Sequence, residues 1–254
     1  MPIDHLQKIA RAPDIDSLRA AFLDAVAAQG FANVFYAARF LPALPNLSRQ
    51  DQDVVITNMP EALLRAVRQT RDGQPALWAQ WASRNDGSIS GRELRKMLVD
   101  PGAALPPDLE AARQFGMEAI QIVSLRSQVM RWTGAVLLNP RAGASHDELE
   151  QLWSDCRREV GLICRVAHLR LATIPHNSGQ PLLTPRQREV LEWRSAGKTV
   201  GEIATIIGVT PATVEKHMRL AREALGAQTT AQAILRAHVA HELFPRQSQI
   251  KPLA

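Results

Sequence analysis

Residues 183–226 read LTPRQREVLEWRSAGKTVGEIATIIGVTPATVEKHMRLAREALG, and this stretch decides the fold of the C-terminal part of the chain. It predicts three successive helices, because a residue suited to capping stands before each one. Thr184 and Gln187 have the spacing of a capping box, in which each side chain satisfies a backbone N–H of the other residue. Thr199 and Glu202 repeat that spacing at the start of the second helix.

The third helix follows a tight turn at 208–210 and begins with Thr210 and Pro211. We expect its inner side to carry Val214, Met218, Ala221 and Leu225, and its outer side to carry Thr213, Lys216, Arg219 and Arg222. We expect the two preceding helices to bury Val190, Leu191, Trp193, Ile203, Ile206 and Ile207. Two short helices joined by a tight turn, the second with a cationic outer side, form the geometry that places a helix in the major groove of DNA.

The same stretch resembles the DNA-binding domain of LuxR-type transcription regulators. The matching residues are Leu183-Thr184-Pro185-Arg186, Glu189-Val190-Leu191, Gly197-Lys198-Thr199, Glu202-Ile203, Gly208-Val209, Thr213-Val214, His217 and Leu225. The resemblance covers about a sixth of the chain. It implies a transcription regulator whose partner is double-stranded DNA.

The charge distribution agrees with a nucleic-acid partner. The chain of 254 residues has a net charge of +5, with 46% hydrophobic and 22% charged residues, as in ordinary globular proteins. Residues 184–254 carry ten Lys and Arg against six Asp and Glu, whereas residues 1–183 carry twenty against nineteen. The positive excess therefore lies with the predicted DNA-binding helices. Because no apolar run reaches the ~18–20 residues of a membrane span and no leader opens the chain, we expect a cytoplasmic protein without membrane contact.

Hydrophobic periodicity and turn signals predict an α+β organisation. We expect helices over 2–11, 16–28 (capped by Asp16), 60–71, 75–84, 91–99, 107–115 and 145–171, and strands over 31–36, 53–57, 119–125 and 132–138, with a turn at 85–87. Helices before and after a central antiparallel sheet form an α/β/α sandwich over residues 1–172. A polar linker at 173–182 leads to an all-α, four-helix domain at 183–244, which includes a helix from Thr230 to about Leu243, and residues 245–254 form a tail. Cys156 and Cys164 lie eight residues apart on one helix, too far apart for a disulfide.

Two classes of N-terminal domain are disfavoured by the residues present. A phosphoacceptor receiver needs a carboxylate at the end of a strand, but the stretch 53–60 has Asn58 in that place. Without the nucleophile and its Mg²⁺ ligands, that chemistry cannot run. An enzyme is disfavoured because the chain has no Gly-x-Ser-x-Gly, His-Glu-x-x-His, Gly-x-x-x-x-Gly-Lys or Cys-x-x-Cys stretch. We therefore expect no catalytic residue, metal or cofactor.

Residues 15–171 resemble the acyl-homoserine-lactone-binding domain of quorum-sensing LuxR-type receptors. The resemblance rests on the order of helices and strands, the Asn58-x-Pro60 helix start, Phe115-Gly116-Met117 before a strand, and Gly134 in the next strand. Positions where the family holds its lactone with polar groups are aliphatic here, and Asp72 is out of register with the family's aspartate. Each lost hydrogen-bond partner costs about 1–3 kcal/mol.

We therefore expect the pocket positions of that family to be packed as core. These positions are Met59, Leu63, Val67 and Leu137, and we expect the tryptophans Trp78, Trp81 and Trp132 to be structural as well. The alternative is that they line a remodelled pocket for an unknown apolar small molecule.

The outer side of the third helix and the helix starts supply the expected DNA contacts. Arg219 stands where related regulators carry a base-reading arginine, and Glu215 occupies a second reading position. Lys198, Thr199, Thr210 and Thr213 lie at helix starts and suit phosphate oxygens, and Lys216 and Arg222 complete the cationic side.

The helix from Thr230 resembles the family's dimerisation helix. Its apolar side of Ala233, Ile234 and Ala237 predicts a homodimer on an inverted repeat whose half-sites lie about one helical turn apart. We therefore expect a dimeric LuxR-type regulator that does not depend on an acyl-homoserine lactone. Two alternatives stay open: a ligand-gated receptor with a remodelled apolar pocket, and an interaction protein that heterodimerises with a related LuxR-type receptor and inhibits it.

Overall fold

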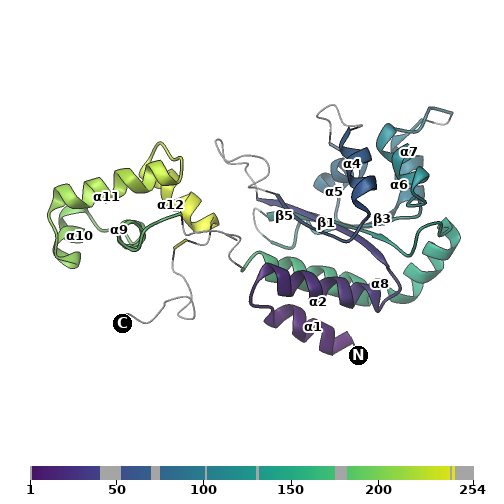
Figure 1. Ribbon diagram of the computed structural model, residues 1–254, viewed down its shortest axis with the longest axis horizontal. Helices are drawn as coiled ribbons and strands as arrows, with labels where there is room; N and C mark the ends of the chain where they lie inside the picture. Colours follow the sequence, from purple (N-terminus) through teal and green to yellow (C-terminus); the bar gives the residue numbers. More distant parts are fainter. Residues whose placement is uncertain are drawn as a thin grey trace. The chain divides into compact units, whose positions relative to one another are not determined.

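The computed structural model describes residues 2–40, 53–69, 75–100, 102–129, 132–174, 182–240 and 242–243 (Figure 1). These residues divide into two compact units, one ending at Thr173 and the other beginning at Ile174. Most of the expected linker at 173–182, and the whole expected tail at 245–254, lie outside the described residues.

The N-terminal unit is built on one antiparallel sheet. Among the described residues, five strands form it in the order β2-β1-β5-β4-β3. Their bounds are β1 Asn33–Phe40, β2 Asp53–Thr57, β3 Gly87–Ser90, β4 Gln121–Ser124 and β5 Trp132–Asn139. β5 and β4 are buried along their length, as expected for central strands with helices on both faces. The α+β class and the central antiparallel sheet are confirmed.

Helices cover both faces of this sheet (Figure 1). One layer contains α1 (Pro2–Arg11), α2 (Ile15–Ala27) and α8 (His146–Leu171), which contact one another and the strands β1, β4 and β5. The other layer contains α4 (Glu61–Gln69), α5 (Leu77–Arg84), α6 (Gly91–Leu98) and α7 (Pro107–Gln114). No described helix combines the length and the apolar composition that crossing a bilayer requires.

Most helices begin close to the residues predicted from the sequence, because capping residues determine where they start. Ser145 and Glu148 form both hydrogen bonds of a capping box at the start of α8. The expected cap of α2 was wrong: Asp14 and not Asp16 accepts the hydrogen bond, from the backbone N–H of Ser17 at 2.7 Å. Asp14 has the extended backbone that a capping residue needs, whereas Asp16 already lies within the helix.

The edge strand β3 was missed in the sequence. The sequence predicts a turn at 85–87 and a helix from 91, but Gly87–Ser90 pair with β4 in antiparallel register. The pattern Gly-Ser-Ile-Ser carries one large apolar side chain, Ile89, so it has little of the β-branched character that marks a strand. β1 likewise begins at Asn33 and extends to Phe40, further than the expected 31–36.

A buried polar contact joins the sheet to α8. The hydroxyl of Tyr36 on β1 lies 2.8 Å from Nδ1 of His168, and Nε2 of His168 lies 3.3 Å from the carbonyl oxygen of Trp132. A carbonyl oxygen only accepts, so Nε2 carries the proton, and Nδ1 accepts from the tyrosine hydroxyl. Burial lowers the pKa of His168 from 6.5 to about 4, which keeps the ring neutral.

Gly134 on β5 permits this contact. A Cβ at this position would lie 2.9 Å from Cε1 of His168 and 3.1 Å from the carbonyl oxygen of Ala37. The imidazole therefore packs directly on the backbone of the strand. Cys156 and Cys164 lie on the same helix as His168 and are both buried and free, so the expectation that they form no disulfide is confirmed.

We expect the N-terminal unit to lose stability as the pH falls from about 6.5 to about 4. The unfolded chain binds a proton at His168 in this window, whereas the folded chain does not, so acidification favours unfolding by on the order of 3 kcal/mol. Thermal unfolding of His168→Gln should show a weaker dependence on pH across this window. Tyr36→Phe is the matched control: it removes the hydroxyl contact at every pH but keeps the titrating ring. An equally steep pH dependence in His168→Gln would contradict the assignment.

Candidate nucleic-acid interface

Three capped helices form the core of the C-terminal unit. They are α9 (Pro185–Ser195), α10 (Val200–Ile207) and α11 (Pro211–Ala224), followed by α12 (Thr230–Val239). Both capping boxes expected from the sequence are formed, at Thr184 with Gln187 and at Thr199 with Glu202. Thr210 caps α11, because its hydroxyl accepts from the backbone N–H of Thr213.

The turn between α10 and α11 depends on one residue with left-handed backbone. Gly208 ends α10 with φ 69° and ψ 38°, a conformation that glycine adopts without a steric penalty. The chain then enters α11 within two residues, at Thr210. The helix-turn-helix geometry predicted from the sequence is therefore present.

Apolar side chains lock α11 onto its neighbours. Its inner side is buried at the four expected positions, Val214, Met218, Ala221 and Leu225. Val214 and Met218 pack in a cluster with Val190 and Ile203. Ala221 and Leu225 pack in a second cluster with Leu183 and Leu191. One expectation was wrong: Ile206 is 45% exposed, and Ala204 is buried instead, because the buried side of α10 runs through residues 203, 204 and 207.

The opposite side of α11 carries exposed charge. Glu215, Lys216 and Arg219 are all exposed. Arg219 Nη1 lies 2.6 Å from Glu223 Oε1, one helical turn further on, and both side chains are more than half exposed. Exposed pairs of this kind contribute little to stability, so the arginine can exchange its carboxylate for another acceptor at small cost.

The two helix starts differ in charge. At α10, the Glu202 carboxylate accepts from both the backbone N–H and the hydroxyl of Thr199, and these hydrogen bonds lower its pKa. The donors of Thr199 are therefore already used by an anion of the chain itself. At α11, Thr210 and Thr213 share a hydrogen bond of 2.9 Å and the first turn has no acidic residue. The start of α11 is accordingly the better place for a phosphate.

Two further cationic residues expected at the interface are partly engaged in the fold. Arg222 is half-buried and donates to the hydroxyl of Thr230 at 3.2 Å, which ties α11 to the start of α12. Lys198 is half-buried in the loop before α10, and its charge contributes to the lowered pKa of Glu202.

The apolar side of α12 packs inside the unit, contrary to its expected role as a dimer surface. Ala233 and Ala237 are fully buried in one cluster with Leu191 and Ala221, and Ile234 packs against that cluster. The apolar stripe was too narrow to form a core by itself, but α9 and α11 supply the rest of the core. Ala233 and Ala237 are therefore not available to a second subunit.

A buried arginine of α12, Arg236, binds carbonyl oxygens at the C-terminal end of α11, a contact that the sequence did not predict. Nη1 of Arg236 donates to the carbonyl oxygens of Leu225, at 2.9 Å, and Gly226. These are carbonyls that the end of a helix leaves without an intrahelical partner, and a cation is favoured there by the helix dipole. An arginine in the middle of an apolar stripe gives no sequence signal of this contact.

An ion pair ties the segment after α12 to α9. Nη2 of Arg188 lies 2.9 Å from Oε2 of Glu242, whose side chain is only 4% exposed. Nε of Arg188 donates to the Glu242 carbonyl oxygen at 2.6 Å, and Oε1 of Glu242 accepts from the backbone N–H of Leu182 at 2.8 Å. The contact joins residues before α9, within α9 and beyond α12.

Most of the expected pocket residues of the N-terminal unit lie together. Trp81 and Leu137 are buried in a cluster with Leu94 and Ile122, and Met59 and Trp78 pack against it. Leu63 is buried and Val67 half-buried on α4, but among the described residues neither is part of this cluster. Trp78 also makes an edge-to-face contact with Phe35, with ring centroids 5.8 Å apart. The apolar side chains contact one another at the places where a polar ligand pocket would need donors and acceptors.

Asn58, which argued against a receiver, has a structural role. Its Oδ1 accepts from the backbone N–H of Val34, and its Nδ2 donates to the carbonyl oxygen of Ala32, both at 2.8 Å. The side chain thereby fixes the end of β2 against β1. No sequence signal distinguished this role from a place in a ligand site.

The C-terminal unit is similar to known regulatory proteins. Residues 181–237 match the luxR family of bacterial regulatory proteins. The chain is 49% identical to the transcriptional activator protein YukR of Yersinia ruckeri over 57 residues, which are 22% of this chain and 25% of that protein. It is 27% identical to the transcriptional activator protein EsaR of Pantoea stewartii over 112 residues, 44% of this chain and 45% of that protein. The chain thus spans less than half of the length of these curated relatives.

Solved structures extend the similarity to the whole fold. Escherichia coli SdiA superposes with a TM-score of 0.53 at 17% identity, covering 94% of this chain and 96% of that one. A structure of SdiA in complex with octanoyl-rac-glycerol has a TM-score of 0.54 at 19% identity, covering 94% and 93%. At this identity the likeness concerns the fold.

We expect Arg188→Met to destabilise the C-terminal unit by about 3 kcal/mol, because it removes the guanidinium that pairs with the buried Glu242 carboxylate. Arg186→Met is the matched control, since Arg186 pairs with Glu189 at the exposed surface of the same helix and should matter by less than about 0.5 kcal/mol. Hydrogen exchange of peptides from residues 183–240 reports on this unit alone. Equal protection in the two variants would show that the buried pair does not hold the unit together.

Proposed function

We propose that the protein is a transcription regulator that binds specific DNA sites as a dimer, because its residues 181–237 match the luxR family of bacterial regulatory proteins. The observation that carries the proposal is the exposed, cationic outer side of α11, held outward by the burial of its inner side. The matched family consists of regulators and not of enzymes. Its place of action would be the bacterial cytoplasm, where the chromosome lies.

In this proposal Arg219 reads a base. Its guanidinium is exposed, and among the described residues it forms an exposed ion pair with Glu223, which a guanine O6 and N7 would replace. Glu215, exposed one turn earlier, accepts from a cytosine amino group, and Lys216 lies beside both. In the free protein, the ion pair with Glu223 orients the Arg219 guanidinium.

The phosphate contacts fall mainly at the start of α11. Thr210 and Thr213 are the preferred contacts, because no carboxylate competes there. Lys198 adds positive charge beside the groove. Thr199 and Arg222 contribute less to phosphate binding than the sequence predicts, because they are hydrogen-bonded to Glu202 and Thr230. The phosphate contacts position the helix, and the base contacts give specificity.

The dimer forms through surfaces other than Ala233 and Ala237, which the unit buries itself. A single module contacts too few base pairs for useful specificity, so two copies on an inverted repeat, about one helical turn apart, are required. The exposed side of α12, with Ala231, Gln232 and His238, is the surface of this helix that stays accessible.

We propose further that DNA binding does not depend on an acyl-homoserine lactone. The support is the apolar cluster around Trp81, Leu137 and Leu94, in which aliphatic and aromatic side chains contact one another. Two alternatives lead to different results when the protein is purified without lactone. They are a ligand-gated receptor with a remodelled apolar pocket and a protein that heterodimerises with a related receptor.

We expect Arg219→Ala to weaken binding to the specific site by about 1–3 kcal/mol and to relax selectivity at one base pair. Lys198→Ala should weaken binding to all sequences alike and reduce its dependence on salt concentration. Gel shifts on a matched and a scrambled site measure both effects. Arg157→Ala, an exposed arginine of α8, controls for the loss of one charge. Equal losses on both sites for Arg219→Ala would refute its role in base recognition.

We expect the full chain, produced without any lactone, to fold, bind DNA and yield no small molecule on solvent extraction and mass spectrometry. Added acyl-homoserine lactones should leave the unfolding temperature unchanged, since a ligand without affinity for the folded state cannot stabilise it. A saturable rise in that temperature, or a specific molecule in the extract, would support the ligand-gated alternative. Recovery of a related regulator in place of a second copy would support the heterodimer.

A further inference from the structure

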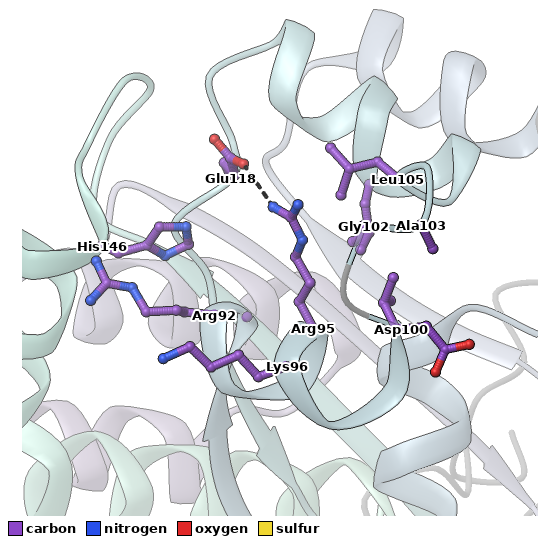
Figure 2. A pocket seen from close by; sticks show the side chains of 12 residues that line it. Arg92, Arg95, Lys96, Asp100, Gly102, Ala103, Leu105, Glu118 and His146 are labelled. Carbon is purple, nitrogen blue, oxygen red and sulfur yellow. Dashed lines mark ion pairs between the residues drawn. The ribbon is translucent and has the colours of Figure 1, made fainter.

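A cleft lies on the outer side of α6 in the N-terminal unit (Figure 2). It has a volume of about 450 Å³, within the range of roughly 300–1,000 Å³ typical of small-molecule sites. Its walls come from α6, from residues 102–109 and from the start of α8. None of the residues of the apolar cluster around Trp81 and Leu137 lines it. The cleft is therefore a separate feature of the same unit.

One wall of the cleft is cationic. Arg92, Arg95 and Lys96 are three and four residues apart, so they share one side of α6. Arg92 is held by Asp147 at 2.7 Å and by Glu150 at 3.4 Å.

Arg95 is held much more loosely. Its Nη1 lies 4.0 Å from the Glu118 carboxylate, beyond hydrogen-bond distance, and its side chain extends into the cleft toward Glu118 (Figure 2). Lys96 is exposed beside it. Asp100, the other acidic residue of the lining, turns its carboxylate away from Arg95 (Figure 2). Arg95 is therefore a cation that an external anion can reach, while Lys96, whose side chain points away from the Arg95 guanidinium, adds positive charge at longer range (Figure 2).

The other surfaces of the cleft are apolar, with one polar exception. Val99, Leu105 and Leu109 are half-buried and line it. Nδ1 of His146, at the start of α8, is buried and has no hydrogen-bond partner among the described residues. A buried nitrogen in this state costs free energy unless a ligand or water satisfies it.

We propose that this cleft binds a small organic carboxylate with an apolar chain. The carboxylate takes the place of Glu118 on Arg95, where a guanidinium offers two parallel N–H donors, and Lys96 adds a second positive charge. The chain lies along Val99, Leu105 and Leu109, and the head group gives His146 Nδ1 the partner that it lacks. A neutral molecule of the same shape would leave Arg95 without its anion.

Because of the position of α6, a ligand in the cleft also affects the rest of the unit. Leu94, on the inner side of the helix, is 2% exposed and belongs to the apolar cluster with Trp81 and Leu137. α6 is thus a shared wall, with the cleft on one side and the apolar cluster on the other. A ligand that fixes Arg95 and Lys96 stabilises α6 against that cluster.

Isothermal titration of the full chain with sodium octanoate, in the absence of DNA, tests the proposal. Octan-1-ol, which has the chain without the charge, and acetate, which has the charge without the chain, are the ligand controls. Arg95→Gln and Lys96→Gln remove the cations one at a time, Arg95→Lys restores a charge, and Arg157→Gln is a matched control on the exposed side of α8. All these positions are at least partly exposed, so the variants should fold, and circular dichroism checks that they do.

We expect saturable octanoate binding that Arg95→Gln weakens by about tenfold or more, a change of about 1.4 kcal/mol. Arg95→Lys should recover part of this loss, Arg157→Gln should bind normally, and octan-1-ol and acetate should bind far more weakly. Absence of saturable binding would overturn the proposal. So would binding that is unaffected by Arg95→Gln, or octan-1-ol binding as strongly as octanoate, since either result would show that Arg95 does not hold a carboxylate. DNA binding plays no part in this experiment, so it succeeds or fails independently of the regulator proposal.

Discussion

The burial of one side of α11 is the constraint on which the C-terminal unit depends. Val214, Met218 and Ala221 are almost fully removed from water, and together with Leu225 they fix the rotation of the helix about its axis. Polar contacts then hold both ends: Thr210 caps the start, and the Arg236 guanidinium binds the carbonyls at the end. With rotation and ends fixed, Lys216 and Arg219 can only face outward. The outward position of the residues that we propose to read DNA therefore follows from core packing.

The N-terminal unit places different chemistry on the two faces of one sheet. On the side of α8, the neutral His168 joins Tyr36 to a strand carbonyl, a buried polar contact that is fully satisfied. On the other side, Trp81, Leu94 and Leu137 belong to an apolar cluster. The charged groups near α6 lie on its outer side, at Arg92, Arg95 and Lys96. Recognition of a polar or charged molecule by this unit therefore belongs outside the apolar cluster.

Local signals in the sequence predicted what they determine directly. Capping residues located the helix starts of the C-terminal unit, and helical periodicity assigned the buried side of α11, because both depend on residues a few positions apart. Long-range contacts were out of reach: the edge strand β3 depends on pairing with β4, and the burial of Ala233 depends on α9 and α11. The Arg219–Glu223 pair could have been read from its four-residue spacing, but the Arg188–Glu242 pair, far apart in the sequence, could not.

Selection of binding sites from randomised duplex DNA by the purified full chain tests the central claim most directly. If α11 reads DNA through Arg219, the selected sequences contain an inverted repeat with half-site centres about one helical turn apart. The same selection with Arg219→Ala should lose one conserved base pair in each half-site and keep the others. Selected pools that remain random, or that are identical for the two proteins, would contradict the account.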